Sequence, residues 1–272
     1  MFRFNRKIHK SVTETNNVVE VTEMDGVRSL HLGSVTVQSS MRVKEPFALE
    51  LPYSRGMMGF LLFQQNTQQV LTIGLGGGSV PKYIWQYCPE IAQTVVELNP
   101  QVIEVARSHF YVPENDARFT VLQEDGLAYL QTHLSMCDVL MIDAFDSVGI
   151  PPDFCTQAFF DDCAEVLRYD GILVINLWGS DKNFDIYLQR IEQSFDGHAL
   201  MLPTGKPGNI VVFGFKQAET PVIKLAQLHT RVQQLALAHR IDFADLVERL
   251  IAHNPHNKLQ FSFDHMRGQA SD

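Results

Sequence analysis

Short apolar runs alternate with segments of helical periodicity along the middle of the chain. This alternation predicts parallel strands joined by crossover helices, because parallel neighbours need a long connection that a helix can supply. The apolar runs predict strands at 70–73, 94–98, 119–122, 139–142 and 172–176. The other segments predict helices from about residue 81 and at 100–109, 127–134, 157–167 and 182–195. We therefore expect a doubly wound α/β core.

Two further apolar runs, 199–202 and 210–215, have no helix-length segment between them. They predict an antiparallel hairpin at one edge of the sheet. A sheet of seven strands that ends in this way is typical of the methyltransferase-like variant of the doubly wound fold.

Smaller units are expected on both sides of this core. The runs VVEVT, VRSLHL and VTVQ lie within residues 18–38 and are separated by turn-forming pairs, which predicts a small antiparallel β unit. An apolar run at 56–63 predicts a short helix before the first core strand, and helical spacing predicts a C-terminal tail of two helices at 222–239 and 243–251. The expected division is an N-terminal β unit at 1–54, a Rossmann-like domain at 55–215 and a helical extension at 216–272.

Composition limits the classes of function. The chain has 272 residues and a formal net charge of −9, which opposes nucleic-acid binding. No apolar run approaches the roughly 20 residues that span a membrane, and the N-terminus lacks the apolar segment of a signal peptide, so we expect a cytoplasmic protein. The four cysteines lack the close pairing of a zinc or redox site, and we expect buried thiols and no metal: Cys88, Cys137, Cys155 and Cys163.

The stretch TIGLGGGSVPKYI places a glycine-rich loop between the first core strand and its helix. Glycine lets the backbone approach a ligand closely, so the loop is compatible with a nucleoside site, although a tight turn is the simpler explanation of the loop taken alone. The glycines in question are Gly74, Gly76, Gly77 and Gly78. The dinucleotide fingerprint would need another glycine at Ser79, which is instead able to cap the following helix.

Acidic residues end or follow three of the predicted strands, at the edge where ligands bind in open α/β sheets. Glu97 lies about 20 residues after the loop, where a carboxylate can accept hydrogen bonds from the hydroxyls of a ribose. Asp125 is suited to an adenine amino group, with Gly126 leaving room for the ring, but the same aspartate would also cap a helix. Asp143 and Asp146 follow the fourth strand and would make the crevice electronegative.

These motifs together resemble the spermidine synthase family, the polyamine aminopropyltransferases, over roughly residues 18–215. The family's ribose, adenine and catalytic motifs resemble VVELNPQVIEVA, EDG and DAFDSVG, and its N-terminal sheet resembles VTVQSS. The motifs GLGGG and DAFDSVGIPP also resemble a divergent spermidine-synthase-like subgroup. The resemblance implies a ribose contact by Glu97, an adenine contact by Asp125, a nucleoside contact by Gln38, acid/base catalysis by Asp143 and an amine-pocket carboxylate at Asp146.

The resemblance also implies a reaction. The family transfers an aminopropyl group from decarboxylated S-adenosylmethionine to an amine such as putrescine, and its members are usually dimers or larger homo-oligomers. The acceptor nitrogen reacts only as the free amine, and an alkylammonium ion has a pKa far above 7, so a base must remove its proton. Asp143 is the candidate base.

Three positions depart from the family pattern. The aspartate of the usual GGGDGG loop, which pairs with the amine of the donor, falls on Gly77, and a tyrosine of the polyamine channel falls on Gly205. The usual Tyr-Gln/His-Glu-Met stretch is replaced by YSRGM, which places Tyr53 and Arg55 at the substrate pocket. The loss of an acid and the gain of a base favour a donor that carries a carboxylate, as ordinary S-adenosylmethionine does.

Three functions therefore stay open from the sequence. They are an aminopropyltransferase with an altered donor and amine pocket, an S-adenosylmethionine-dependent methyltransferase, and a non-catalytic protein that binds a nucleoside or a polyamine. The two acids Asp143 and Asp146 favour the first over the third, because binding alone has less need of a base. Gly77 favours the second over the first.

Overall fold

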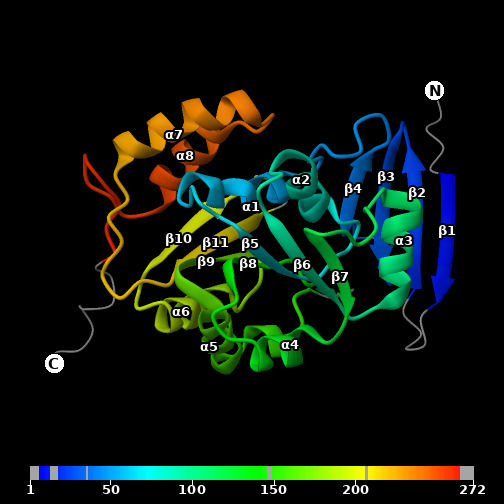
Figure 1. Ribbon diagram of the computed structural model, residues 1–272, viewed down its shortest axis with the longest axis horizontal. Helices are drawn as coiled ribbons and strands as arrows, with labels where there is room; N and C mark the ends of the chain where they lie inside the picture. The colour runs from blue at the N-terminus through cyan, green and yellow to red at the C-terminus, as the bar shows by residue number, and fades with distance from the viewer. Residues whose placement is uncertain (1–5, 13–17, 35, 146–148, 206–207, 264–272) are drawn as a thin grey trace.

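The computed structural model describes residues 6–12, 18–34, 36–145, 149–205 and 208–263, and it contains two sheets (Figure 1). The smaller sheet is antiparallel with the order β1-β2-β3-β4. Its strands are β1 (Arg6–Val12), β2 (Val18–Met24), β3 (Val27–Leu32) and β4 (Ser39–Arg42). The larger sheet has seven strands in the order β10-β11-β9-β8-β5-β6-β7. The strands are β5 (Gln69–Ile73), β6 (Ala92–Glu97), β7 (Phe119–Gln123), β8 (Cys137–Ile142), β9 (Leu167–Trp178), β10 (Ala199–Pro203) and β11 (Asn209–Phe215).

The predicted seven-stranded fold is confirmed. Strands β5 to β9 are parallel to one another, whereas β11 pairs antiparallel with both β9 and β10, as the missing helix between the last two strands predicted. The chain order reverses between β5 and β8, because β6 and β7 extend the sheet to one side and β9 extends it to the other. The carboxyl ends of β5 and β8 therefore form a topological switch point, where such sheets bind their ligands.

Helices cover both faces of the large sheet (Figure 1). The helices α1 (Pro52–Met57) and α2 (Ser79–Tyr87), the 3-10 helix η1 (Met58–Leu62), and the tail helices α7 (Leu225–Ala238) and α8 (Phe243–His253) share one apolar cluster with the sheet. The other face is covered by α4 (Gly126–Thr132), α5 (Gln157–Val166) and α6 (Phe184–Ser194), with the 3-10 helix η2 (Pro152–Cys155) before α5. Helix α3 (Pro100–Phe110) packs through Val102, Val105 and Phe110 against the small sheet.

The N-terminal unit differs from the prediction in two places. Strand β1 was not predicted, because its sequence RKIHKSV is polar and its side chains are largely exposed at the edge of the sheet. The run VTVQ was predicted as a strand, but β4 begins only at Ser39. Residues 36–38 instead belong to the connection from β3, where Thr36 donates its N–H to Ser34 Oγ and its carbonyl contacts the His31 ring. The turn at Asp25-Gly26 is confirmed, with positive φ at both residues.

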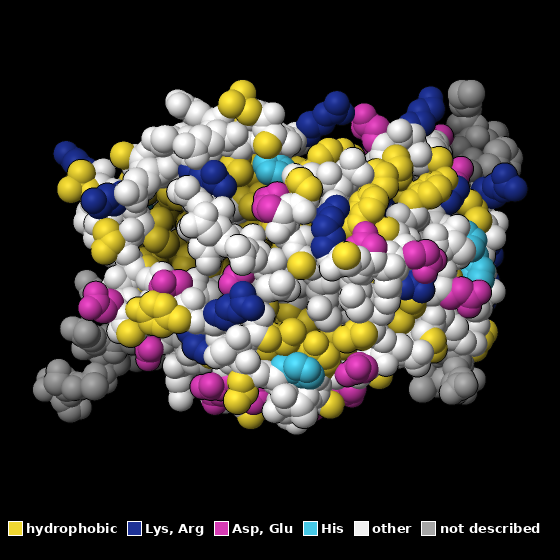
Figure 2. All heavy atoms as spheres, in the orientation of Figure 1, with side chains coloured by type: hydrophobic (Ala, Val, Ile, Leu, Met, Phe, Trp, Pro, Cys, Tyr) yellow, Lys and Arg dark blue, Asp and Glu magenta, His cyan; other side chains and the backbone are white. Residues whose placement is uncertain are grey.

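Three further observations concern the membrane, surface-charge and cysteine predictions made from the sequence. Within the described residues, no helix has the length and apolar character needed to cross a membrane. On the face shown in Figure 2, basic side chains are scattered among acidic ones. The four cysteines are free and buried, as predicted.

Candidate active site

The predicted site residues follow neighbouring strands at the carboxyl edge of the large sheet. The glycine loop follows β5, Glu97 ends β6, Asp125 comes two residues after β7, and Asp143 comes directly after β8. Strands β5 and β8 are hydrogen-bonded as far as their ends, where Asp143 donates its N–H to the Ile73 carbonyl. The loop and the candidate base are therefore adjacent at the switch point.

Backbone geometry makes glycine necessary in the loop. Gly74, Gly76 and Gly78 have positive φ, and a Cβ at Gly74 would lie 2.5 Å from the Asp143 backbone oxygen. Helix α2 begins at Ser79 with Gly78 as its N-cap, so the prediction that Ser79 caps this helix is wrong. The Ser79 hydroxyl instead donates to the Ser40 carbonyl at 3.5 Å, because it is turned toward β4.

Ser39 of β4 completes the loop and was not found by sequence reasoning. Gly77 donates its N–H to Ser39 Oγ at 2.9 Å. A Cβ at Gly77 would lie 2.8 Å from Ser39 Cβ and 3.0 Å from the Phe110 ring, so the packing here leaves no room for a side chain at position 77. The small sheet thus contributes a buried hydroxyl at the place where the family pattern has an aspartate.

Glu97 connects the loop to the next strand. One carboxylate oxygen accepts from Leu75 N at 2.9 Å, and the other accepts from Asn99 N at 2.8 Å. Burial raises the pKa of Glu97, and the backbone N–H groups around the carboxylate oppose this effect. A half-buried carboxylate that contacts the glycine loop is suited to accept hydrogen bonds from the hydroxyls of a ligand bound there.

Asp125 caps α4, so one of its two predicted roles is confirmed. Its Oδ1 accepts from Leu127 N at 2.8 Å and from Ala128 N at 3.2 Å. At Gly126 a Cβ would lie 2.4 Å from Ile73 Cγ2, so glycine is needed there for packing against β5. The adenine contact of Asp125 stays a prediction.

Asp143 is a half-buried carboxylate with neutral hydrogen-bonding partners. Asn176 of β9 donates its amide N–H to Asp143 Oδ1 at 3.1 Å. The pKa of Asp143 is raised to about 6, because burial raises it more than the hydrogen-bonding groups of Asn176 and Tyr53 lower it. The Tyr53 hydroxyl lies between Asp143 and the Gln38 carbonyl, to which it donates at 3.0 Å. Burial, followed by the charge of Asp143, raises the pKa of Tyr53 well above its ordinary value, so this phenol stays protonated.

A cavity of about 520 Å³ opens beside these groups. Gln38, Tyr53 and Asn176 contribute to its wall, as do Phe145 and Trp178, whose rings stack with centroids 5.7 Å apart. The remaining lining residues are Thr36, Val37, Leu51, Pro52, Ser180, Thr204, Gly208 and Asn209. Asp146 lies outside the described residues.

The chain carries the sequence signature of a known family along most of its length. The family model described as the spermine/spermidine synthase domain matches residues 50–221. A polyamine aminopropyltransferase of Chromobacterium violaceum is 37% identical over 250 residues, which are 92% of this chain and 95% of that protein. The chain belongs to the spermine/spermidine synthase family. A polyamine aminopropyltransferase of Neisseria meningitidis is 40% identical over 244 residues, 89% of this chain and 92% of that protein.

Solved structures support the fold of this family member. A spermidine synthase in complex with the transition state analogue AdoDATO has a TM-score of 0.70 at 17% identity, covering 89% of this chain and 85% of that one. Human methyltransferase-like protein 13 in complex with SAH has a TM-score of 0.59 at 21% identity, covering 79% of this chain and 97% of that one. Both neighbours confirm the methyltransferase-like architecture predicted from the strand pattern.

Arg55 is placed differently from the other residues predicted for this family member. Its guanidinium donates to the carbonyls of Leu49 at 2.6 Å and Glu50 at 3.0 Å. It lines two other cavities, one beside Tyr83 and one beside Asp245, and it does not line the cavity of Tyr53. Successive positions of α1 point in different directions, which is why Tyr53 and Arg55 separate although they are two residues apart.

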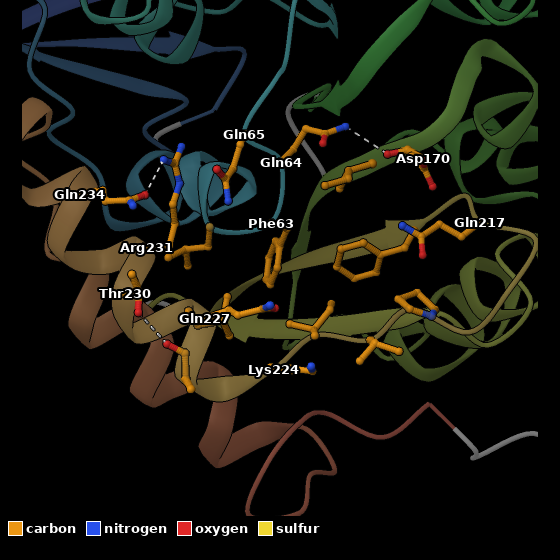
Figure 3. A pocket seen from close by; sticks show the side chains of 18 residues that line it. Phe63, Gln64, Gln65, Asp170, Gln217, Lys224, Gln227, Thr230, Arg231 and Gln234 are labelled. Atoms are coloured by element: carbon orange, nitrogen blue, oxygen red, sulfur yellow. Dashed lines mark hydrogen bonds between the residues drawn. The ribbon is translucent and has the colours of Figure 1, made fainter.

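The structure has another cavity, of about 640 Å³ (Figure 3). It is bounded by α7, the chain after η1 and the end of β11, and its labelled side chains include Phe63, Arg231 and several glutamines. None of the predicted site residues lines it. Within the described part of the chain, no three His, Cys, Asp or Glu side chains gather as metal ligands would.

Proposed function

We propose that the protein transfers an aminopropyl group from decarboxylated S-adenosylmethionine to a polyamine-type amine such as putrescine. The observation that carries this proposal is the environment of Asp143. It is a half-buried carboxylate at the switch point, beside a cavity with an aromatic wall, and its removal from water raises its pKa to about 6. At neutral pH such a group is ionised, yet it binds a proton more readily than an exposed aspartate does.

The chemistry assigned to Asp143 is one proton transfer. Its carboxylate removes a proton from the acceptor ammonium, which frees the nitrogen lone pair. The nitrogen then attacks the donor's propyl carbon next to sulfur, so that a C–N bond forms, the C–S bond breaks, and the sulfur leaves as the neutral thioether methylthioadenosine. The cation–π attraction of the Phe145 and Trp178 rings would hold the ammonium in the cavity before the reaction.

The donor site is proposed at the glycine loop. Glu97 would accept the ribose hydroxyls, Asp125 the adenine amino group, and Gln38 would contact the nucleoside. The backbone of Gly74, Gly76, Gly77 and Gly78 would face the sulfonium region. Tyr53 would line the acceptor side, and the assignment of Asp146 to the amine pocket stays a proposal from the sequence. Arg55 is not included, since its guanidinium is bonded to backbone carbonyls away from the cavity.

A methyltransferase is the second candidate, and one observation favours it. At Gly77 the loop meets the uncharged hydroxyl of Ser39, so this position offers no carboxylate for the free amine of a decarboxylated donor. A mouse eEF1A lysine and N-terminal methyltransferase is also 28% identical over 201 residues, although these are only 27% of that protein. The donor would then be ordinary S-adenosylmethionine.

Calorimetric titration with both donors and with methylthioadenosine separates these candidates. We expect the decarboxylated donor to bind more tightly, and turnover with putrescine to disappear in Asp143→Asn while donor binding persists. A tenfold preference for the carboxylated donor, about 1.4 kcal/mol, would contradict aminopropyl transfer. If none of the three compounds binds, both catalytic proposals fail.

Location and assembly belong to the same proposal. We infer a cytoplasmic protein that forms a homodimer or a larger homo-oligomer, as the family resemblance implies. Light scattering of the purified protein would measure its mass in solution against the 30.8 kDa of one chain. A single-chain mass at micromolar concentration would contradict the proposed assembly.

A further inference from the structure

A chain of two hydrogen bonds leads away from Asp143 across the sheet. Asn176 donates its amide N–H to Asp143 Oδ1 at 3.1 Å, and its own Oδ1 accepts from Asn209 Nδ2 at 3.0 Å. The three residues belong to the end of β8, to β9 and to the start of β11, which are neighbours in the sheet. The sequence offered no signal for Asn209, because it lies 33 positions from Asn176 and in no recognised motif.

The two ends of an amide side chain differ in hydrogen bonding, so the partner at one end of Asn176 determines which end faces Asp143. An ionised carboxylate only accepts hydrogen bonds, whereas an amide has a donor end and an acceptor end. The N–H of Asn209 occupies the acceptor end of Asn176, and this keeps the donor end of Asn176 toward Asp143. If the amide of Asn176 turned over, its oxygen would face Asp143, which would repel the carboxylate and favour the protonated acid.

Asn209 is itself held in place through its backbone. Its carbonyl accepts from Thr204 N and from Thr204 Oγ1, both at 2.9 Å, and the preceding residue Gly208 accepts from Gly179 N at 2.7 Å. Asn176 is only 2% exposed, so few other partners are available for its amide. Both asparagines line the cavity proposed for the acceptor.

We propose that Asn209 is a positioning residue for the acid/base group, acting through Asn176 to hold Asp143 in its ionised, proton-accepting form. This inference rests on the proposed function for its catalytic meaning, but the hydrogen-bond chain itself does not. Asn209 does not contact the reacting proton, and its effect is on the proton affinity of Asp143. This arrangement favours an acceptor amine that binds as an ammonium ion and transfers a proton to the Asp143 carboxylate.

The groups around Asp143 make the proposal testable by pH. Among the described residues, Tyr53 of α1 is the titratable side chain that contacts it, and this phenol stays protonated across the neutral range. From β9 and β11 the nearby groups are the neutral amides of Asn176 and Asn209, and from β5 the neighbour is backbone. A change in the titration of Asp143 would therefore report on the amides.

The decisive variants are Asn209→Asp and Asn209→Ala. A carboxylate at position 209 would accept from the N–H of Asn176, turn its oxygen toward Asp143 and add a negative charge nearby. We expect the titration of Asp143, followed by carbon NMR of its carboxyl group, to move to higher pH by about one unit in Asn209→Asp. A smaller shift in the same direction is expected in Asn209→Ala, where Asn176 is free to turn. The low-pH limb of kcat/KM should move with the titration.

Asn257→Asp is the matched control, because it adds the same charge at an exposed site whose side chain accepts from Leu259 N and Gln260 N. It should leave the titration of Asp143 unchanged. An unchanged titration in both Asn209 variants would overturn the proposal, and so would an equal shift in the control. If the titration shifts as expected but the wild-type protein transfers no aminopropyl group, the positioning role stands and the proposed function fails.

Discussion

At the scale of single residues, the site contains carboxyl groups whose ionised form is disfavoured by burial. Asp143 has no cation among its described partners and accepts only from neutral groups. A carboxylate in such an environment lowers stability when it is ionised, which is tolerated where the proton affinity is needed for chemistry. This cost also argues against a purely binding role, because a neutral side chain of the same shape would bind a nucleoside as well.

Asp143→Asn should therefore abolish turnover and stabilise the protein at neutral pH. Burial raises the pKa of Asp143 from an ordinary value of 3.8 to about 6, so the ionised form lowers stability above pH 6. This difference corresponds to at most about 3 kcal/mol. The gain should be largest above pH 6 and vanish below about pH 4, where both states are protonated. Urea unfolding at several pH values measures it, and a variant less stable than wild type at pH 7 would contradict the assignment of a half-buried carboxylate that has no cationic partner among the described residues.

Gly74→Ala should be far more destabilising than another substitution at a glycine of positive φ. At Gly74 the new Cβ would lie 2.5 Å from the Asp143 backbone oxygen, so β5 and β8 must separate at the switch point. At Gly26, which has φ +75°, a Cβ would meet nothing within 4 Å. We expect Gly26→Ala to cost about 1 kcal/mol through backbone strain alone, and Gly74→Ala more than about 3 kcal/mol. Equal losses in urea unfolding would show that the close approach is unimportant.

At the scale of elements, the site depends on strand ends and on the turns that follow them. Glu97 ends its strand, and Gly74, Asp125 and Asp143 come at most two positions after theirs, so the sheet fixes their places, while the following helix or loop fixes their directions. The same residue then often has a structural and a binding role. Asp125 is the clearest case, since its Oδ1 caps α4 while the proposed adenine contact would use the carboxylate as well.

Asp125→Ser separates the two roles. Serine is a good N-cap, so the stability of the protein should change by less than about 0.5 kcal/mol, whereas the affinity for methylthioadenosine should fall about tenfold through loss of a hydrogen bond to a carboxylate. Asp242→Ala is the control, because Asp242 caps α8 by accepting from Asp245 N at 3.1 Å. It should lower stability by about 1 kcal/mol without changing this affinity. Calorimetry that finds wild-type affinity in Asp125→Ser would leave Asp125 with a capping role only.

The elements of the large sheet could be predicted from the sequence because each strand is an apolar run and each helix has apolar spacing. Strand β1 could not be found, because a polar edge strand has no such pattern. Side-chain contacts between residues far apart in the sequence could not be predicted either. The hydroxyl of Ser39 accepts from Gly77, which is 38 positions away. The hydrogen bond between Asn209 and Asn176 depends on the register of β11 against β9. Arg55 does not line the cavity that Tyr53 lines, because side chains two positions apart on α1 point in different directions.

At the scale of the whole molecule, the C-terminal helices complete the core that supports the site. Helix α8 packs against β10, the edge strand of the large sheet, and buries Phe243, Leu246, Val247 and Leu250. Figure 1 shows α7 and α8 together on one side of the sheet, over β10 and β11. These helices belong to the same apolar cluster as α1 and η1, so the segment that carries Tyr53 is supported by the tail.

Asn254, directly after α8, also satisfies the open edge of β10. Its Oδ1 accepts from Met201 N and its Nδ2 donates to Met201 O, both at 2.7 Å, so its amide replaces the neighbouring strand that β10 lacks on this side. An uncovered sheet edge presents unpaired backbone groups and promotes association with other chains. The residue is 8% exposed, so water would compensate poorly for its loss.

Asn254→Ala should therefore lower the free energy of unfolding by about 1 to 3 kcal/mol, since two backbone groups of Met201 lose their partner in a largely buried place. Asn257→Ala removes two side-chain hydrogen bonds from an exposed turn, to Leu259 N and Gln260 N, and should cost less than about 1 kcal/mol because water replaces them. Urea unfolding compares the two variants, and light scattering on mild heating should show earlier aggregation of Asn254→Ala only. Equal effects of the two substitutions would mean that the edge of β10 is protected by the helices alone.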